Sequence, residues 1–226
     1  MSDSIEFFSR NLQSISSKQQ QLLRQKQVSV VGCGGLGGYV IEQLVRLGVG
    51  RIHCFDPDVF SVSNGNRQLY ATSATLGKSK AESAAKRAAA IHDYCEVVPF
   101  ALDYRKAPAE AVFQVDVVVD CLDDVAVRLE LSAACRRQKK MLVHGSVSGW
   151  VGQVGVQLPG GRLYEKLYPA PRHRPDEALS VLACTVGLIA SLQVSETIKI
   201  LLDLPPSLAE TALFVDLHKQ EFVRMG

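Results

Sequence analysis

The chain has 226 residues, of which 47% are hydrophobic and 21% are charged, and this balance excludes a disordered or fibrous protein. The length suits one large α/β domain rather than a multi-domain assembly. The 25 Lys and Arg against 23 Asp and Glu leave a net charge of +2, which is too small for nucleic-acid binding through the whole surface.

The sequence shows no pattern typical of a membrane protein or a zinc protein. The start at Met1 to Ser4 has neither a basic nor an apolar leader region, and the longest near-apolar run, Val181 to Val194, is too short to span a bilayer. The six cysteines include no C-x-x-C pair, and the five histidines form no H-x-E or H-x-x-x-H motif. We therefore expect a cytoplasmic protein with mostly buried cysteines, no membrane partner and no zinc site.

Strand and helix signals alternate over the first half of the chain, after a segment from Ile5 to Gln25 that reads as one or two amphipathic helices in need of a partner surface. Such alternation predicts a parallel sheet with right-handed crossovers. The predicted strands are Val28 to Val31, Arg51 to Asp56, Glu96 to Leu102 and Val115 to Cys121, and the predicted helices are Tyr39 to Leu47 and Lys78 to Ile91.

The second half adds a helix from Arg128 to about Gln138, strands over 141–146 and 151–158, a helix over 180–202 and a hairpin from 213–216 and 221–224. The proline-rich stretch from Gly160 to Glu177 is predicted to be a loop or crossing segment rather than a helix. The expected fold is one α/β domain with a doubly wound, Rossmann-like, mainly parallel sheet. Its parts are a helical arm over 1–27, a nucleotide-binding sheet core over 28–158, a crossing loop over 159–179 and a C-terminal helix and hairpin over 180–226.

A glycine-rich turn follows the first predicted strand. Gly32, Gly34 and Gly37 form a G-x-G-x-x-G motif that opens a helix, so backbone N–H groups can approach a phosphate. Asp56 ends the next strand, where a carboxylate can accept hydrogen bonds from ribose hydroxyls. These features fit an ATP enzyme as well as a nicotinamide or flavin enzyme, and a turn built from small residues only for packing would look the same.

Three cations follow the glycine turn in sequence and favour a triphosphate. Arg67, Lys78 and Lys80 are predicted near the mouth of the turn, although each alone is more often a solvated surface charge. A triphosphate, unlike a bound dinucleotide, needs its charge neutralised before attack. The concentration of basic residues therefore favours ATP over a dinucleotide.

Ordered blocks of sequence carry a resemblance to a known family. In them the chain resembles the ThiF/MoeB/HesA family of the ubiquitin-activating enzyme superfamily, over about Arg10 to Leu202. Its members are adenylyltransferases that activate the C-terminal glycine of ubiquitin-like sulfur carrier proteins. The blocks are Val31 to Gly37, Gly48 to Gly50 with Asp56 to Asp58, Ser63 to Gln68, Leu76 to Lys80, Asp120 to Asp124 with Arg128, and Ser191 to Gln193 with Glu196 and Lys199.

The resemblance implies ATP and Mg²⁺ as ligands and gives matching residues their roles. Asp123 would lie near Mg²⁺ and the α-phosphate, although Asp120 and Asp124 compete for that assignment and a helix N-cap is its plain structural role. Arg10 would reach across a homodimer to the nucleotide of the other subunit, and Arg67 and Lys80 would act at the phosphate chain. The implied nucleotide-binding residues are Gly32, Gly34, Gly35, Gly37, Asp56, Asp58, Asn64, Arg67, Gln68 and Lys80.

The chain departs from the family pattern at several positions. Asn11 replaces a glutamine that is usual there, and both C-x-x-C pairs of the zinc-binding members are absent. The crossing loop holds no cysteine, and the nearest one, Cys184, falls where relatives often have a proline. The resemblance therefore implies adenylation, but not a later thioester or persulfide step.

We expect an enzyme that adenylates the terminal carboxylate of a small ubiquitin-like sulfur carrier protein ending in Gly-Gly, with nucleic acid an improbable partner. One alternative is a dehydratase acting on threonylcarbamoyl-adenosine in tRNA, for which the basic residues 172–174 and the cluster of Arg136, Arg137, Lys139 and Lys140 could supply a patch. Two others are a non-catalytic partner subunit, which ATP binding would exclude, and a nicotinamide dehydrogenase, which lack of NAD binding would exclude.

Overall fold

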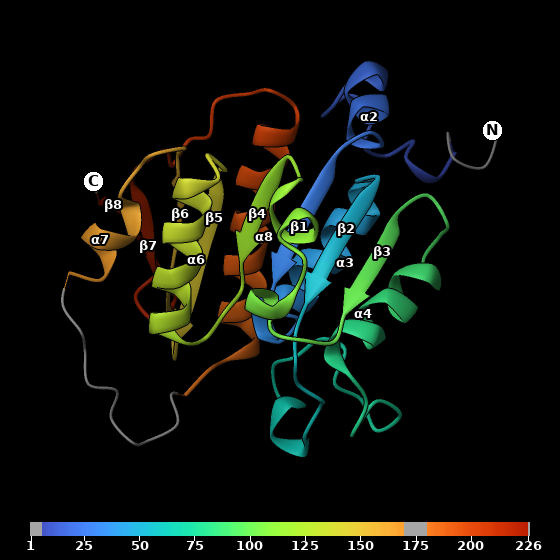
Figure 1. Ribbon diagram of the computed structural model, residues 1–226, viewed down its shortest axis with the longest axis horizontal. Helices are drawn as coiled ribbons and strands as arrows, with labels where there is room; N and C mark the ends of the chain where they lie inside the picture. The colour runs from blue at the N-terminus through green and yellow to red at the C-terminus, as the bar shows by residue number, and fades with distance from the viewer. Residues whose placement is uncertain (1–5, 170–179, 226) are drawn as a thin grey trace.

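The computed structural model describes residues 6–169 and 180–225, which form helices around an eight-stranded sheet (Figure 1). The order of the strands across the sheet is β3-β2-β1-β4-β5-β6-β7-β8. This is the mainly parallel, Rossmann-like α/β architecture that the sequence predicts. The strands are β1 (Gln27–Val31), β2 (Arg51–Phe55), β3 (Glu96–Phe100), β4 (Val117–Asp120), β5 (Leu142–Ser148), β6 (Val151–Gln157), β7 (Ala212–Asp216) and β8 (Glu221–Met225).

The parallel half of the sheet has the connectivity that creates a ligand crevice. The chain runs outward from β1 to β2 and β3, and then returns to place β4 on the other side of β1. Strands β4 and β5 pair in parallel, while β5 to β8 pair antiparallel as successive neighbours. Open α/β sheets bind ligands at the carboxyl ends of the strands where the order reverses, which here lies between β1 and β4.

Helices cover both faces of the sheet, and the buried strands alternate between them. Val30, Val117 and Val119 belong to the core under α3, α4 and α8, whereas Val31 and Val118 belong to the core under α5, α6 and α7. The helices are α2 (Ser17–Leu23), α3 (Gly35–Leu47), α4 (Lys80–Ala89), α5 (Ala109–Phe113), α6 (Val125–Arg137), α7 (Leu163–Leu167) and α8 (Ala183–Leu201), and two 3₁₀ turns are η1 (Val62–Asn64) and η2 (Tyr104–Lys106).

The stretch predicted to be a loop from Gly160 to Glu177 contains a short helix, α7, so that prediction is wrong in part. Leu163 and Tyr164 are almost fully buried against the sheet on the α6 face. Their burial stabilises a helical turn in a segment whose proline content argues against one. Residues 170–179 of the predicted crossing loop lie outside the described residues.

Helix α8 is longer than the apolar run that the sequence analysis singled out. It has 19 residues with a mean hydropathy of 1.3, so by length and composition it could cross a membrane. Half of that stretch is buried inside the fold, and Ile189, Ala190 and Val194 pack into the core with α3. This is the environment of a core helix.

The N-terminal arm packs on its own chain. Phe8 and Leu23 are buried, and a Cβ atom added to Gly48 would lie 2.9 Å from the Phe8 ring. Gln20 adds a hydrogen bond of 2.8 Å to the carbonyl of Leu47. Of the one or two expected amphipathic helices, the seven-residue α2 is complete within the described residues, and a helical turn includes Glu6 and Phe7. Within its own chain, the arm packs on the far end of α3.

Candidate nucleotide-binding site

The glycine turn lies in the crevice between β1 and β4. Gly32 has a φ of +96°, and a Cβ atom there would lie 2.6 Å from the carbonyl oxygen of Cys121, which follows β4. Gly37 approaches still more closely, since its Cβ would lie 1.8 Å from the Gly32 carbonyl oxygen. Both positions therefore require glycine. Helix α3 starts at Gly35, four residues before the predicted start, and its N-cap, Gly34, has no side chain to cap the N–H groups.

Asp56 ties the end of β2 to this turn. Its Oδ2 accepts the backbone N–H of Cys33 at 2.7 Å, and its Oδ1 accepts the N–H of Asp58 at 2.9 Å. Burial raises the pKa of Asp56, and the charge of Lys80 together with the two N–H donors opposes that rise. The structure thus brings Asp56 to the glycine turn, in the relation expected of a ribose-binding carboxylate.

Lys80 stands at the start of α4 and reaches the loop that follows Asp56. Its Nζ lies 2.9 Å from Oδ2 of Asp58, although only 7% of the residue is exposed. Its backbone N–H donates to the carbonyl of Asp58, and bridges at Val59 and Phe60 fasten the two loops together. Lys78, in contrast, is exposed. Of the three predicted cations, Lys80 is the one held inside the site.

The loop before α4 carries the remaining predicted nucleotide contacts. Gln68 is buried beside Gly34, and its Oε1 has no hydrogen-bond partner among the described residues. Arg67 instead donates to the carbonyl of Ser63 and to Oδ1 of Asn66, both at 2.9 Å. Oδ1 of Asn64 accepts the N–H of Ser61, which caps η1. In this structure the side chains of Arg67 and Asn64 therefore make hydrogen bonds within their own loop.

The three acidic residues at the end of β4 and after it, which were alternatives for the position near Mg²⁺, have different environments in the structure. Asp120 is fully buried and bonded to Arg128, His144 and Tyr164. Asp124 is the N-cap of α6 and accepts the N–H of Val127. Asp123 is exposed at the carboxyl edge of the sheet, next to the residues that touch Gly32. The buried network around Asp120 was missed by sequence reasoning because His144 and Tyr164 lie far away in the chain and belong to no motif.

Arg10 lies far from the glycine turn of its own chain. The arm that carries it packs on Gly48, at the C-terminal end of α3, and Figure 1 shows the arm at the sheet edge opposite the carboxyl ends of β1 and β2. The 13 residues of α3 separate the two ends by about 20 Å. Arg10 is exposed there, so it is not part of the site within one chain.

The comparisons with known proteins agree with this geometry. The model of the ThiF family matches residues 8–225. The chain belongs to the ThiF family. It is 33% identical over 225 residues to the SAMP-activating enzyme E1 of Haloferax volcanii, covering 96% of this chain and 83% of that protein. It is 34% identical over 230 residues to the adenylyltransferase and sulfurtransferase MOCS3 of Danio rerio, covering 97% of this chain and 50% of that protein.

The chain spans about half the length of most curated relatives that it matches. Solved structures share the fold at low identity. Escherichia coli MccB superposes with a TM-score of 0.85 at 18% identity, covering 98% of this chain and 71% of that one. PaaA superposes with a TM-score of 0.81 at 17% identity, covering 99% and 73%. The fold of this ThiF-family chain is therefore that of MccB and PaaA.

Among the described residues of this ThiF-family chain, no group of three or more His, Cys, Asp or Glu side chains could hold a metal ion. Five cysteines are buried, and burial raises the pKa of the Cys95 and Cys135 thiols to about 12. Cys184 is exposed in the first turn of α8. The cysteines are therefore mostly buried, as expected, and Cys184 is the exception.

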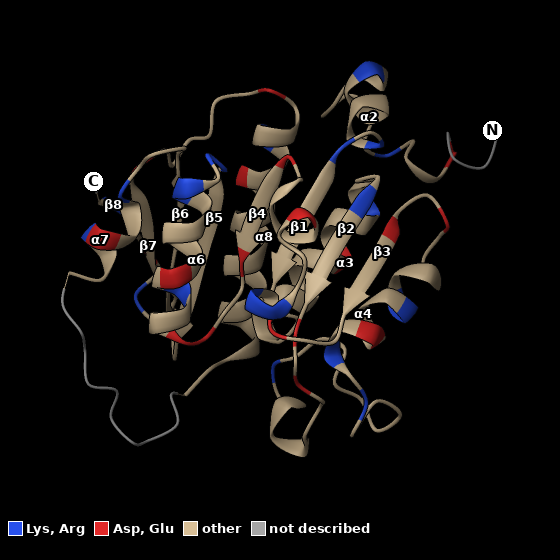
Figure 2. Ribbon diagram, in the orientation of Figure 1, with Lys and Arg blue, Asp and Glu red and all other residues tan. Residues whose placement is uncertain are grey.

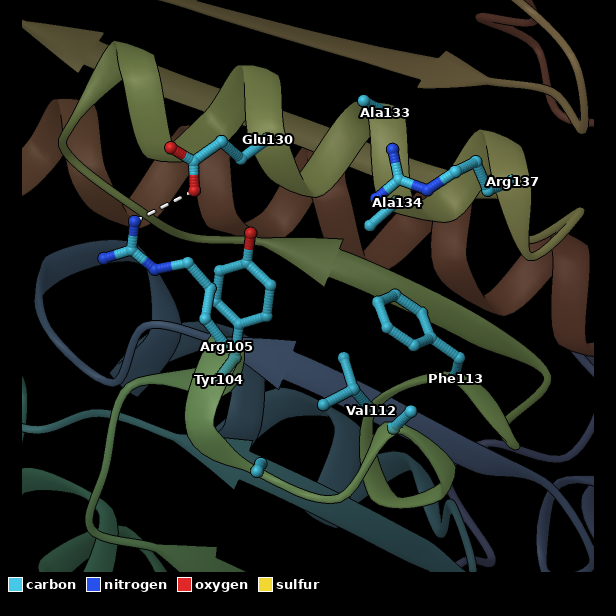
Figure 3. A pocket seen from close by; sticks show the side chains of 10 residues that line it. Tyr104, Arg105, Val112, Phe113, Glu130, Ala133, Ala134 and Arg137 are labelled. Carbon is cyan, nitrogen blue, oxygen red and sulfur yellow. Dashed lines mark hydrogen bonds and ion pairs between the residues drawn. The ribbon is translucent and has the colours of Figure 1, made fainter.

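A cavity of about 390 Å³ lies away from this site, on the α6 face of the sheet. Tyr104, Val112 and Phe113 give it an apolar lining, and the Arg105–Glu130 ion pair of 2.9 Å joins η2 to α6 at one end (Figure 3). No residue that the sequence predicts for the nucleotide is among those that line it. The candidate nucleotide site at the carboxyl edge of the sheet is therefore separate from this cavity.

Charged residues are mixed in sign over the described chain, and the loops around the site carry both (Figure 2). The basic cluster considered for tRNA is partly engaged within the protein. Arg136 pairs with Glu165 at 2.6 Å, and Lys140 donates to the carbonyl of Val115. Residues 172–174, the other basic group, lie outside the described residues.

Proposed function

We propose that the chain binds ATP with Mg²⁺ and adenylates the C-terminal carboxylate of a small ubiquitin-like sulfur carrier protein, releasing pyrophosphate. The observation that carries this proposal is the junction at the sheet edge. There Asp56 holds the glycine turn, buried Lys80 pairs with Asp58 beside Asp56, and exposed Asp123 follows Leu122, whose backbone nitrogen lies next to Gly32. The relatives named for adenylyltransferase and SAMP activation support the same reaction.

The residues at this edge have the chemistry that MgATP requires. Asp56 would accept the ribose hydroxyls, the turn from Gly32 to Gly37 would offer backbone N–H groups to the phosphates, and Lys80 would neutralise phosphate charge. Asp123 offers the hard carboxylate oxygens that Mg²⁺ prefers, and Mg²⁺ is commonly held by one or two carboxylates together with substrate phosphates. When bound there, the ion would stabilise the negative charge on the phosphate chain.

The reaction needs positioning rather than a base. The carrier carboxylate is already ionised at neutral pH, so one of its oxygens forms the new bond to the α-phosphorus. The bond from the α-phosphorus to the oxygen that bridges to the β-phosphate breaks, and pyrophosphate leaves with that electron pair. Lys80, with Arg67 after its loop turns toward the nucleotide, would stabilise the leaving charge.

A Gly-Gly tail suits the carrier because glycine passes through a narrow channel without side-chain clashes. We propose that the enzyme is a homodimer, since Arg10 could serve only the site of another chain. We also propose that the reaction takes place in the cytoplasm. The exposed Cys184 lies in the first turn of α8, and the proposed adenylation step uses no thiol.

A direct test is to incubate the protein with MgATP and a carrier protein that ends in Gly-Gly, and to look by mass spectrometry for the acyl-adenylate. A carrier whose C-terminus is amidated is the matched control, because it keeps the tail but lacks the nucleophile. We expect the adenylate only with the free carboxylate. Binding of ATP without any adenylate would contradict the proposal, absence of ATP binding would favour a non-catalytic partner subunit, and salt-sensitive retention of tRNA would favour the tRNA enzyme.

A further inference from the structure

A buried polar network lies directly beneath the loop that carries Asp123. Asp120 is fully buried at the end of β4. Its Oδ1 accepts the backbone N–H of Leu122 at 3.0 Å, and its Oδ2 accepts the hydroxyl of Tyr164 at 2.7 Å. The carboxylate thus connects α7 to the loop from two sides.

Arg128, on α6, also forms hydrogen bonds to this loop and to its neighbours. The residue is 3% exposed, and its Nη1 lies 3.4 Å from Oδ2 of Asp120 and donates to the carbonyl of Gly145 at 2.6 Å. Its Nη2 donates to the carbonyl of Leu122, which belongs to the peptide bond that joins Leu122 to Asp123. Both polar groups of Leu122 are therefore hydrogen-bonded, and the peptide unit immediately before Asp123 cannot rotate without breaking a partly buried hydrogen bond.

His144 closes the network on the side of β5. Its Nδ1 lies 3.2 Å from Oδ2 of Asp120, and its Nε2 lies 3.2 Å from the amide nitrogen of Gln153 and 3.4 Å from the hydroxyl of Tyr168. A neutral ring with the proton on Nδ1 satisfies these three contacts, since Nδ1–H donates to Asp120 while Nε2 accepts. Nη1 of Arg128 also lies 3.3 Å from Nδ1, and it then donates to Asp120 and Gly145 and not to the ring. The network is thus well satisfied with a single ion pair, Asp120 and Arg128.

Buried ion pairs are a poor source of stability, because desolvation offsets most of their attraction and a well-packed apolar pair of similar size serves as well. Their better-attested use is to specify one geometry. We propose that Arg128 is a positioning residue, which with Asp120 holds the Leu122–Asp123 peptide so that the Asp123 carboxylate faces the α-phosphate side of the crevice. This inference rests on the proposed adenylation.

The kinetic test compares Arg128→Lys with Ser132→Ala. Lysine keeps the positive charge near Asp120 but cannot also hold the carbonyls of Gly145 and Leu122. Ser132 is the matched control, since it is also buried on α6 and loses a 2.6 Å hydrogen bond, to Gln157, outside the network. We expect Arg128→Lys to lower kcat for carrier-dependent ATP–pyrophosphate exchange by about tenfold to a hundredfold, with KM for ATP nearly unchanged, while Ser132→Ala leaves kcat as in the wild type.

A second readout needs no substrate. Hydrogen–deuterium exchange at the Leu122 amide reports whether the loop is held, and we expect faster exchange there in Arg128→Lys and, to a smaller degree, in Tyr164→Phe, but not in Ser132→Ala. Tyr164→Phe removes only the hydroxyl that donates to Asp120, so it keeps the test open if Arg128→Lys does not fold.

Wild-type exchange at Leu122 together with a wild-type kcat in the network variants would overturn the positioning role. An equal loss of kcat in Ser132→Ala would overturn it as well, because general destabilisation would then explain the effect. Failure of adenylation itself is seen separately, as a wild-type protein with no carrier-dependent exchange at all.

Discussion

The carboxylate of Asp56 accepts the backbone N–H of Cys33 at 2.7 Å, so the end of β2 and the glycine turn after β1 are one unit. Asp58 donates its own N–H to the same carboxylate and pairs with Lys80. The ribose, phosphate and cation positions of the candidate site are therefore coupled through a few short hydrogen bonds. Substitutions here are expected to alter ATP binding before they alter the rest of the fold.

Asp56→Asn tests that coupling. The amide has one acceptor instead of two, so either Cys33 or Asp58 loses its partner, and we expect ATP affinity to fall by about tenfold or more by calorimetry. Asp116→Asn is the matched control, because Asp116 also accepts a backbone N–H, from Gln27 at 2.7 Å, but at the opposite edge of the sheet. Equal losses of ATP affinity in the two variants would show that Asp56 has no special relation to the nucleotide.

Lys80→Ala should weaken ATP binding and slow adenylation together, each by about tenfold or more, because the ammonium is buried in the site before and during attack. Lys86 lies on the same helix and is exposed, so Lys86→Ala controls for loss of a lysine from α4. Titration calorimetry and the exchange assay measure the two effects. A Lys80 variant with normal ATP affinity would place the cation outside the site.

The acid sensitivity of the fold should depend on His144. Burial lowers the pKa of His144 below its ordinary value of 6.5, and the hydrogen bond to Asp120 offsets this only in part. Because the unfolded chain takes up the proton first, this contribution to stability is complete above pH 6.5 and is lost as the pH falls toward the folded-state pKa. We expect the unfolding free energy of the wild type to decline as the pH falls below about 6.5, and to decline less in His144→Gln.

The same measurement on His218→Gln is the control, since His218 is exposed near the C-terminal hairpin. Identical pH slopes for the wild type and His144→Gln, measured by denaturant unfolding, would mean that His144 is not buried in its neutral form. A reduced slope of unfolding free energy against pH in His218→Gln would assign the acid sensitivity to His218 instead of His144.

Arg10 should act only across a dimer, because about 20 Å of α3 separates its arm from the glycine turn of the same chain. Arg10→Ala and Asp123→Ala homodimers are each expected to be nearly inactive. Co-refolding equal amounts gives about half heterodimers, and one of the two sites in each has both groups intact. About a quarter of the wild-type activity should therefore return, whereas no recovery on mixing would exclude a role in trans.

Much of the fold could be predicted from local patterns, since runs such as Val28 to Val31 and the glycines after them determine strand, turn and helix. What escaped prediction depends on contacts between distant segments. The helix α7 forms because Leu163 and Tyr164 are buried against the sheet. The apolar face of the arm packs on α3 of the same chain. Neither partner can be read from sequence spacing alone.

The site shows the same division. The motifs identify Asp56, Lys80 and the glycine turn, which the structure brings together. They cannot rank Asp120, Asp123 and Asp124, because three acidic residues within five positions look equivalent until burial and hydrogen bonds distinguish them. The current orientation of Arg67, toward Ser63 and Asn66, also depends on loop geometry that the sequence does not encode locally.

The most direct test of the account is carrier-dependent ATP–pyrophosphate exchange in the wild type and in Asp123→Ala, with ATP binding measured on the same samples. We expect the wild type to exchange, and Asp123→Ala to bind ATP but to exchange about two to four orders of magnitude more slowly, since its carboxylate acts mainly in the transition state. Near-normal exchange by Asp123→Ala would contradict the assignment of the site. Absence of exchange in an ATP-bound wild type with a Gly-Gly carrier would contradict the proposed function.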